Sequence, residues 1–251
     1  KATFIAAPRE LSAARFAQLI KEYLPTGNIV LGLAKEPYVL GLEDQPQFAV
    51  LQQPTVQGII DKVNASRSPH KIYTLSYFQR DLTYLLEKLS FTKAVFVRGS
   101  LYRAFHLRPE FYALVNRKLA YQLVSPFVDE AEAQQYAKTT KLAALPTQGT
   151  FSQQQLFDLA SRAATHSYAY SEFQTGVALG KKAGSAYRLI ATAHNTVVPY
   201  QTYAMHHGAA REVNFSPMND LNYYDALHAE MQLLAHALHA GTPLAGHNAV
   251  Y

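Results

Sequence analysis

The segment ATFIAAPRELSAARFAQLIKEYLPTGNIVLGLA, residues 2–34, contains a strand, a helix and a second strand in succession. Residues 2–7 and 28–34 are short apolar runs, which are typical of strands buried on both faces. Between them, residues 9–24 place apolar side chains at helical spacing, and Pro25-Thr26-Gly27 ends the helix. This pattern predicts two parallel neighbouring strands joined by a helical crossover.

The same alternation continues toward residue 140 and predicts a parallel sheet. A short strand is expected at residues 48–51. Strands that alternate with helices at this spacing are typical of a Rossmann-like α/β domain, which we assign to residues 1–145. The remaining elements are expected at residues 53–64 (helix), 71–75 (strand), 82–89 (helix), 93–98 (strand), 107–123 (helix) and 129–140 (helix).

The first half contains no phosphate-binding glycine loop, since neither G-x-G-x-x-G nor G-x-x-x-x-G-K-[ST] is present. Residues 35–48 form a polar loop after a strand, with Glu43 and Asp44 adjacent. Open parallel sheets bind ligands at the carboxyl ends of their strands, so this loop is a candidate contact for a nucleotide or a sugar. A plain connecting loop is the simpler interpretation. The first half alone predicts no function.

The composition is that of a folded protein with two domains. The chain has 251 residues, of which 49% are hydrophobic and 16% charged, enough for two units with cores of their own. No apolar run reaches about 18 residues, so we expect no membrane span and a cytoplasmic protein. The net charge of +5 permits binding of anionic nucleotides, but the basic residues are scattered as on an ordinary surface. Cysteine is absent, which excludes thiolate metal ligands within these residues.

The second half follows a Pro- and Gly-containing stretch at residues 145–150 and is assigned to residues 150–251. Its expected order is helix, strand, strand, helix, strand. Ser152 and Gln155 have the form of a capping box at the start of the first helix. The other elements are expected at residues 173–180 (strand), 187–193 (strand), 197–224 (long loop), 225–240 (helix) and 247–251 (strand).

The second helix of this half carries His228-Ala229-Glu230, an H-x-E triplet, in its first turn. We expect the helix to pack from one side, through a buried stripe of Leu227, Met231, Leu234 and Leu238, so that its start faces a pocket. An isolated H-x-E triplet is a weak signal, because a chain with 10 histidines often contains one by chance.

From Ser152 onward the sequence resembles the cytidine and deoxycytidylate deaminase superfamily. FQTGVALGKK is similar to the first strand of that family, LIATAHNT to its second strand, and HAE to its metal-and-acid motif. The resemblance implies a cytidine-deaminase-like α/β/α domain that hydrolyses a cytosine nucleoside or nucleotide to the uracil product and ammonia. The full family signature is H-x-E followed by P-C-x-x-C, in which the Glu is a general acid/base and not a ligand.

The resemblance implies a role for each matching residue. His228 resembles the imidazole ligand of a Zn²⁺ ion, and Glu230 resembles the group that carries protons. Asn195 and Ala229 resemble substrate-binding residues. Arg211, in the long loop, is a candidate phosphate contact, and a solvated surface arginine is an equal alternative.

The sequence departs from the family because P-C-x-x-C is missing. Two interpretations remain open, a degenerate relative that lost its metal and a sequence that stops before the motif. We favour the second and expect the two Cys ligands of the Zn²⁺ beyond Tyr251, so these residues alone are expected to be inactive. His206 and His207 are a weaker candidate for a structural metal, whereas two other histidines, His236 and His239, are expected on a solvated face.

Three functional classes therefore stay open. The first is a zinc-dependent hydrolase acting on a small nucleoside or nucleotide, in a homo-oligomer as the resemblance implies. The second is an inactive protein of the same fold that binds a nucleotide or a partner. The third is a deaminase that acts on a base in RNA or DNA, which needs a basic, aromatic groove that the sequence does not indicate.

Overall fold

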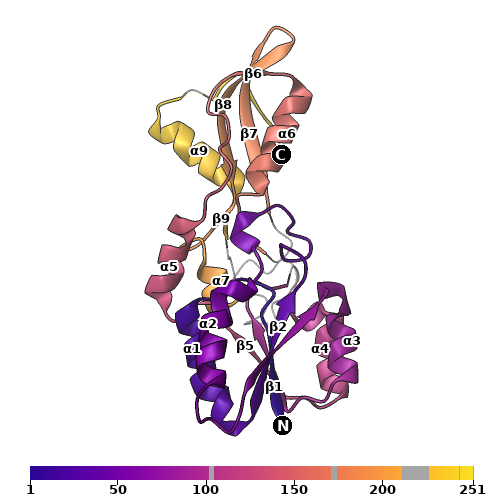
Figure 1. The fold of residues 1–251 in the computed structure, drawn as a ribbon. Coiled ribbons are helices and arrows are strands. Elements are labelled where there is room, and N and C mark those ends of the chain that lie inside the picture. Colours follow the sequence, from indigo (N-terminus) through magenta and orange to yellow (C-terminus); the bar gives the residue numbers. More distant parts are fainter. Residues whose placement is uncertain (102–104, 171–173, 211–225, 243, 251) are drawn as a thin grey trace.

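The computed structural model describes residues 1–101, 105–170, 174–210, 226–242 and 244–250. These residues form an α/β structure with two main sheets, one from each half of the chain, that lie at opposite ends of an elongated molecule (Figure 1). Within the described residues, no helix combines the length and the apolar character needed to cross a bilayer.

The first sheet has five parallel strands in the order β3-β2-β1-β4-β5. The chain therefore starts in the centre, adds strands on one side, and then crosses to the other side between β3 and β4. This arrangement confirms the parallel sheet expected from residues 2–34. The strands are β1 (Ala2–Ala6), β2 (Asn28–Ala34), β3 (Ile72–Tyr77), β4 (Lys93–Val97) and β5 (Tyr121–Val124).

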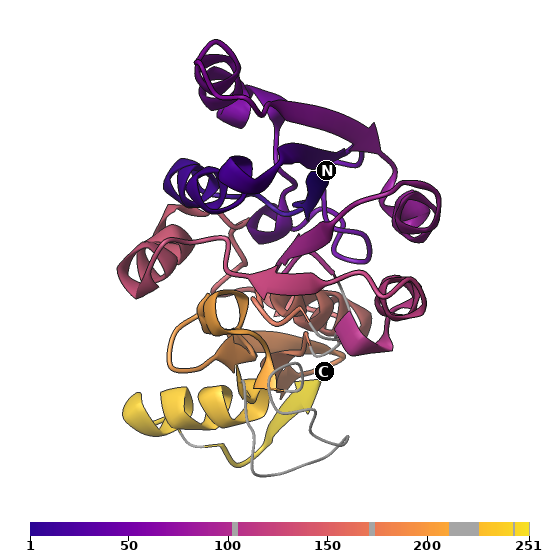
Figure 2. The same cartoon turned by 90° about the horizontal axis from the view of Figure 1, so that it is seen from below.

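Helices cover both faces of this sheet, as Figure 2 shows. On one side lie α1 (Ala13–Tyr23), α2 (Gln53–Asn64) and α5 (Glu130–Thr139), and on the other lie α3 (Leu82–Lys88) and α4 (Pro109–Asn116). The central strands β1, β2 and β4 are thus shielded from water on both faces, which explains why they are almost continuously apolar, whereas the edge strand β3 exposes Tyr73, Thr74 and Ser76.

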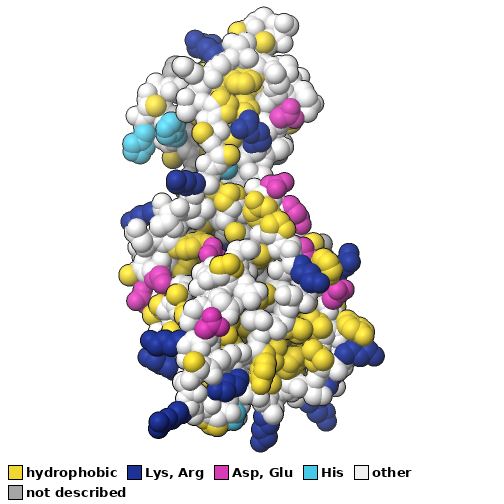
Figure 3. Space-filling model, in the orientation of Figure 1, with side chains coloured by type: hydrophobic (Ala, Val, Ile, Leu, Met, Phe, Trp, Pro, Cys, Tyr) yellow, Lys and Arg dark blue, Asp and Glu magenta, His cyan; other side chains and the backbone are white. Residues whose placement is uncertain are grey.

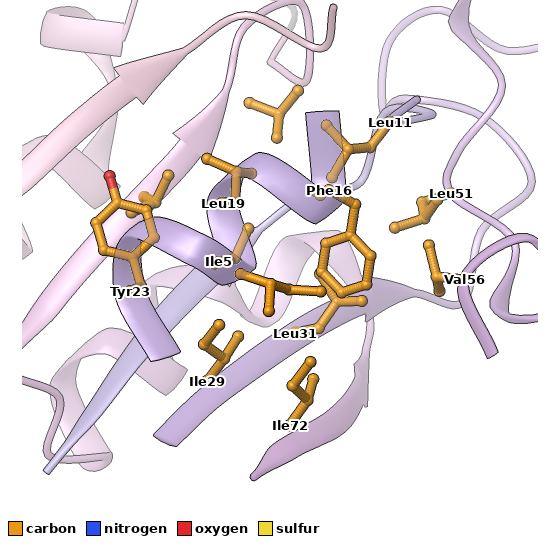
Figure 4. Close-up of a cluster of buried hydrophobic side chains, with 14 of the residues drawn as sticks. Ile5, Leu11, Phe16, Leu19, Tyr23, Ile29, Leu31, Leu51, Val56 and Ile72 are labelled. Atoms are coloured by element: carbon orange, nitrogen blue, oxygen red, sulfur yellow. The ribbon is translucent and has the colours of Figure 1, made fainter. Parts of the chain in front are cut away.

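Apolar side chains of α1 and of the central strands form the core on the first side (Figure 4). Phe16 and Leu19 of α1 pack over Ile5 and Leu31, and all four side chains are fully buried. Helix α1 begins at Ala13 instead of the expected residue 9, because Ser12 accepts a hydrogen bond from Arg15 N and caps the helix there.

Two other expectations in this half were wrong. Residues 48–51 are not a sheet strand. Pro46–Phe48 is a 3₁₀ turn, and Ala49 and Val50 make only isolated bridges. The long helix expected at residues 107–123 ends at Asn116 and is followed by strand β5. The chain turns at Lys118, whose φ of +53° is a left-handed conformation. No Gly or Pro stands there to indicate a turn in the sequence.

The second sheet has the order β11-β7-β8-β6 and is antiparallel. Its central hairpin turns at Gly184, whose φ of +65° suits glycine. Helix α6 packs on this sheet and begins with the expected capping box of Ser152 and Gln155, which is confirmed. The elements are β6 (Thr150–Phe151), α6 (Gln153–Ala164), β7 (Gly176–Ala183), β8 (Ala186–His194), α9 (Ala229–His239) and β11 (His247–Val250).

A buried cluster joins the two halves of the chain. It brings Phe48 of the first half together with Tyr168, Tyr170 and Met205 of the second, and helix α7 (Tyr203–His207) lies within it. The Gln47 side chain crosses the same junction, donating to the carbonyl oxygens of Thr165 and Ser167 at 2.8 and 3.0 Å. The two assigned domains therefore share a core, although the assigned boundary between them stays a prediction.

Candidate functional site

A short antiparallel pairing brings the candidate residues of the second half together. Strand β10 (Ala226–Leu227) pairs with β9 (Thr196–Val197), and Leu227 lies opposite Thr196. If this register is continued by one residue, His228 falls opposite Asn195. The pairing thus joins the start of α9 to the end of β8, where Asn195 is located.

The H-x-E triplet lies at the start of helix α9, and this helix starts a few residues later than expected. Helix α9 begins at Ala229 and not near residue 225, so His228 is the N-cap residue with extended backbone angles (φ −61°, ψ 146°). Ala229 is fully buried, and Glu230 lies in the first helical turn. Because the N-cap residue has non-helical backbone angles, the roughly 200° that separates positions i and i+2 within a helix does not apply to His228 and Glu230.

Glu230 carries an unusual carboxylate. Its Oε2 atom is buried and has no hydrogen-bond partner in the part of the chain that the structure describes. A buried carboxylate oxygen without a donor is costly, so such an atom indicates that a ligand, a water molecule or a proton completes its environment. The first turn of a helix favours a negative charge, which is consistent with a carboxylate held ready at this position.

Asn195 has a structural task that the sequence did not reveal. It is 5% exposed, and its Oδ1 accepts a hydrogen bond from Thr175 N at 2.8 Å, while its own N–H donates to Thr175 O. The side chain therefore ties the end of β8 to the chain just before β7. This bond uses one of the two lone pairs of Oδ1, so the other lone pair stays compatible with a contact to substrate.

Gln232 is a positioning residue that sequence reasoning missed. Its Nε2 atom donates to His194 O at 2.7 Å and to the hydroxyl of Thr196. These bonds fix the first turn of α9 against the β8–β9 connection and so set the position of Glu230. The only sequence signal is a polar residue four positions after His228, between the apolar residues Met231 and Leu233.

Two further histidines, His166 and His194, also escaped notice. Their ring centroids are 5.8 Å apart in an edge-to-face arrangement, and His194 Nε2 is buried without a hydrogen-bond partner among the described residues. Burial, with a smaller contribution from the charge of His166, lowers the pKa of His194 to about 4. Burial also lowers the pKa of His166. At neutral pH both rings are therefore neutral.

The expected buried stripe of α9 was wrong. Exposed fractions of 43% for Leu227, 55% for Met231, 41% for Leu234 and 76% for Leu238 show that this face points to solvent. The buried side chains are instead Ala229, Leu233 and Ala237, which contact the β7–β8 hairpin. The small alanine side chains let the helix approach the sheet closely. Apolar residues occur on more than one face of this helix, so the spacing of apolar residues does not identify the buried face.

The remaining candidates divide as follows. Arg211 lies outside the described residues. The His206 Nδ1 and Ser125 Oγ atoms share a hydrogen bond of 2.7 Å, and burial lowers the pKa of the imidazole. His236 and His239 are exposed, as expected. No group of three or more His, Cys, Asp or Glu side chains that could hold a metal ion occurs within the described ranges.

Comparisons with models of protein families, with curated proteins and with solved structures found no match.

Proposed function

We propose that the second half of the chain is a deaminase-type site for a cytosine nucleoside or nucleotide. The observation that carries the proposal is the buried Oε2 of Glu230, which has no partner among the described residues, near a β9–β10 pairing whose register, continued by one residue, sets His228 opposite Asn195. The order of helix, two strands, helix and strand agrees with the same interpretation. The cytoplasmic location and the homo-oligomer remain expectations.

The proposed reaction is cytosine plus water giving uracil plus ammonia. Glu230 accepts one proton of the attacking water and delivers it to ring N3, then carries the second proton from the new C4 hydroxyl to the amino group, so that the C4–N bond breaks, ammonia leaves and the C4 carbonyl forms. A carboxylate whose oxygen is not already hydrogen-bonded can exchange protons with such a ligand. Gln232 keeps this carboxylate in place through its bonds to His194 O and Thr196.

The described residues do not make a complete zinc site. A catalytic zinc takes three protein ligands, and among the proposed residues only His228 offers one. The chain has no cysteine, and the described residues contain no metal-binding group of three. Zinc at this site would need two more ligands than these residues bring together.

The proposal is tested by measuring ammonia release from cytidine and dCMP, together with zinc content, for the wild-type chain and for Glu230→Gln. If the wild type turns over, the variant should lose about 10²–10⁴-fold in rate, because it can no longer carry the proton. The matched control is Glu87→Gln, an exposed carboxylate on α3 in the other half. Full activity in Glu230→Gln would refute the role of Glu230.

A second candidate is a nucleotide-binding protein of this type without catalysis. It would use the same buried Glu230 Oε2 atom to hold the base and would need no metal ion. Two results together would select this candidate. The wild type would bind CMP in a calorimetric titration without releasing ammonia, and Glu230→Gln would weaken that binding.

A further inference from the structure

A groove in the first half opens at the carboxyl ends of β2 and β3. It has a volume of about 450 Å³ and is lined by seven residues from β3, from the start of α3 and from the residue after β2. This volume falls in the range of about 300–1,000 Å³ that small-molecule sites occupy. Open parallel sheets bind ligands outside the carboxyl ends of their strands, most often where the strand order reverses, which here is between β1 and β4; the groove lies at the same edge, beside β2 and β3. The lining residues are Lys35, Ser76, Tyr77, Phe78, Asp81, Tyr84 and Leu85.

Two cations meet over one aromatic ring at the groove. Lys35 Nζ lies 4.6 Å and Arg80 Cζ 5.0 Å from the centroid of the Phe78 ring. Each cation is attracted to the Phe78 ring, which thereby orders both long side chains beside the groove. In Figure 3, Lys and Arg side chains border hydrophobic ones on the side of the molecule where α3 lies in Figure 1.

Little negative charge neutralises this pair. No carboxylate forms an ion pair with Lys35 within the described part of the chain. Arg80 faces Asp81 at 3.9 Å, but both side chains are largely exposed, so the attraction is weak. The nearby Glu36 carboxylate accepts from Gln79 N at 3.1 Å and is thereby turned to the backbone. The groove therefore presents the Lys35 ammonium group in its lining and the Arg80 guanidinium group beside it on the Phe78 ring.

The groove also offers a flat aromatic surface and a free hydroxyl. Tyr84 is 59% exposed, which leaves its ring open to stacking. Tyr77 is 4% exposed, and its hydroxyl is buried without a hydrogen-bond partner among the described residues. Burial raises the pKa of this hydroxyl, so it stays protonated and can donate. A phosphate beside Lys35 and a planar base on Tyr84 would both lie within this groove.

We propose that this groove binds a nucleoside phosphate, with Lys35 and Arg80 on the phosphate and Tyr84 against the base. The site uses no residue of the deaminase-type site and does not depend on that function. An anion with a planar ring fits the groove better than either part alone, because Lys35 and Tyr84 both line it and Arg80 contacts the Phe78 ring of the same lining.

The experiment is calorimetric titration of the full chain with ADP, with inorganic phosphate and with adenosine. We expect ADP to bind more tightly than either part. Lys35→Ala and Arg80→Ala should each weaken ADP binding by about tenfold, and Tyr84→Ala should weaken ADP but not phosphate. Lys62→Ala, an exposed lysine on α2 across the sheet, is the control with the same change of charge and should bind like the wild type.

Several results would overturn the proposal. These are no ADP binding at about 1 mM, equal loss in the Lys62 control, and phosphate binding as tight as that of ADP. Binding of a single-stranded oligonucleotide without binding of ADP would also overturn it, since the ligand would then be a nucleic acid. All four substituted side chains are exposed, so the variants should fold, and a far-UV circular dichroism spectrum checks this.

Discussion

Gly176, the first residue of β7, should not tolerate any side chain. A Cβ atom at this position would lie 2.1 Å from Ala160 O and 2.3 Å from Ala164 N, both backbone atoms of α6. Ordinary contacts of a Cβ atom are longer than 3.0 Å, so Gly176→Ala must move the helix away from the strand by roughly 1 Å. A backbone cannot rotate out of the way as a side chain can.

That movement disturbs the packing of the second sheet. The face of α6 that meets β7 and β8 contains Leu156, Leu159 and Ala160, all buried. Overpacking a core costs typically about 1–3 kcal/mol, and we place Gly176→Ala at the upper end, about 3 kcal/mol, because backbone atoms of a whole helix must shift. This is a large share of a typical total stability of about 5–15 kcal/mol.

The measurement is urea unfolding followed by circular dichroism, with Gly58→Ala as the matched control. Gly58 lies inside α2, and an added Cβ would meet nothing within 4 Å. The same substitution there should stabilise the chain by about 1 kcal/mol through helix propensity. A free energy of unfolding for Gly176→Ala within about 0.5 kcal/mol of the wild type would refute the close approach of α6 to β7.

Two other expected outcomes follow from α9 and from the buried imidazoles. Leu233 is buried and Leu238 is exposed, so Leu233→Ala should lower the free energy of unfolding by about 2–5 kcal/mol and Leu238→Ala by less than about 0.5 kcal/mol. Urea titrations measure both values, and equal losses would contradict the assignment of the buried and exposed faces of α9. His194 has a pKa of about 4 when folded and 6.5 when unfolded, so below pH 6.5 the unfolded chain binds the extra proton. Stability should therefore fall from pH 6.5 toward pH 4, and His194→Gln should flatten this decline; an unchanged profile would count against the burial of the ring.

The parallel sheet could be predicted from the sequence because local signals and burial agree there. Strand β2 (Asn28–Ala34) and helix α2 (Gln53–Asn64) lie at the predicted residues. A Gly precedes the strand, and Pro54 stands at the start of the helix, where its missing N–H does no harm. Strand β5 was missed because the turn at Lys118 uses a left-handed non-glycine residue, which no composition rule marks.

The candidate site was predictable only in part. The H-x-E triplet can be seen in the sequence, because its residues are adjacent. Gln232 and the His166–His194 pair cannot, because their relation to the site depends on how α9 and α6 pack on β8. The buried face of α9 could not be predicted either. Two of its faces are apolar, and the one that packs on the sheet is the one whose small side chains allow a close approach.

The buried cluster at the junction has a consequence for how the chain unfolds. Phe48 packs against Tyr168, and Gln47 satisfies two carbonyl groups of the other half. If either sheet melted alone, it would expose these apolar rings and strip the carbonyls of their donor. The two sheets should therefore behave as one cooperative unit, in which a substitution at one end of the molecule changes the hydrogen-exchange protection of the other.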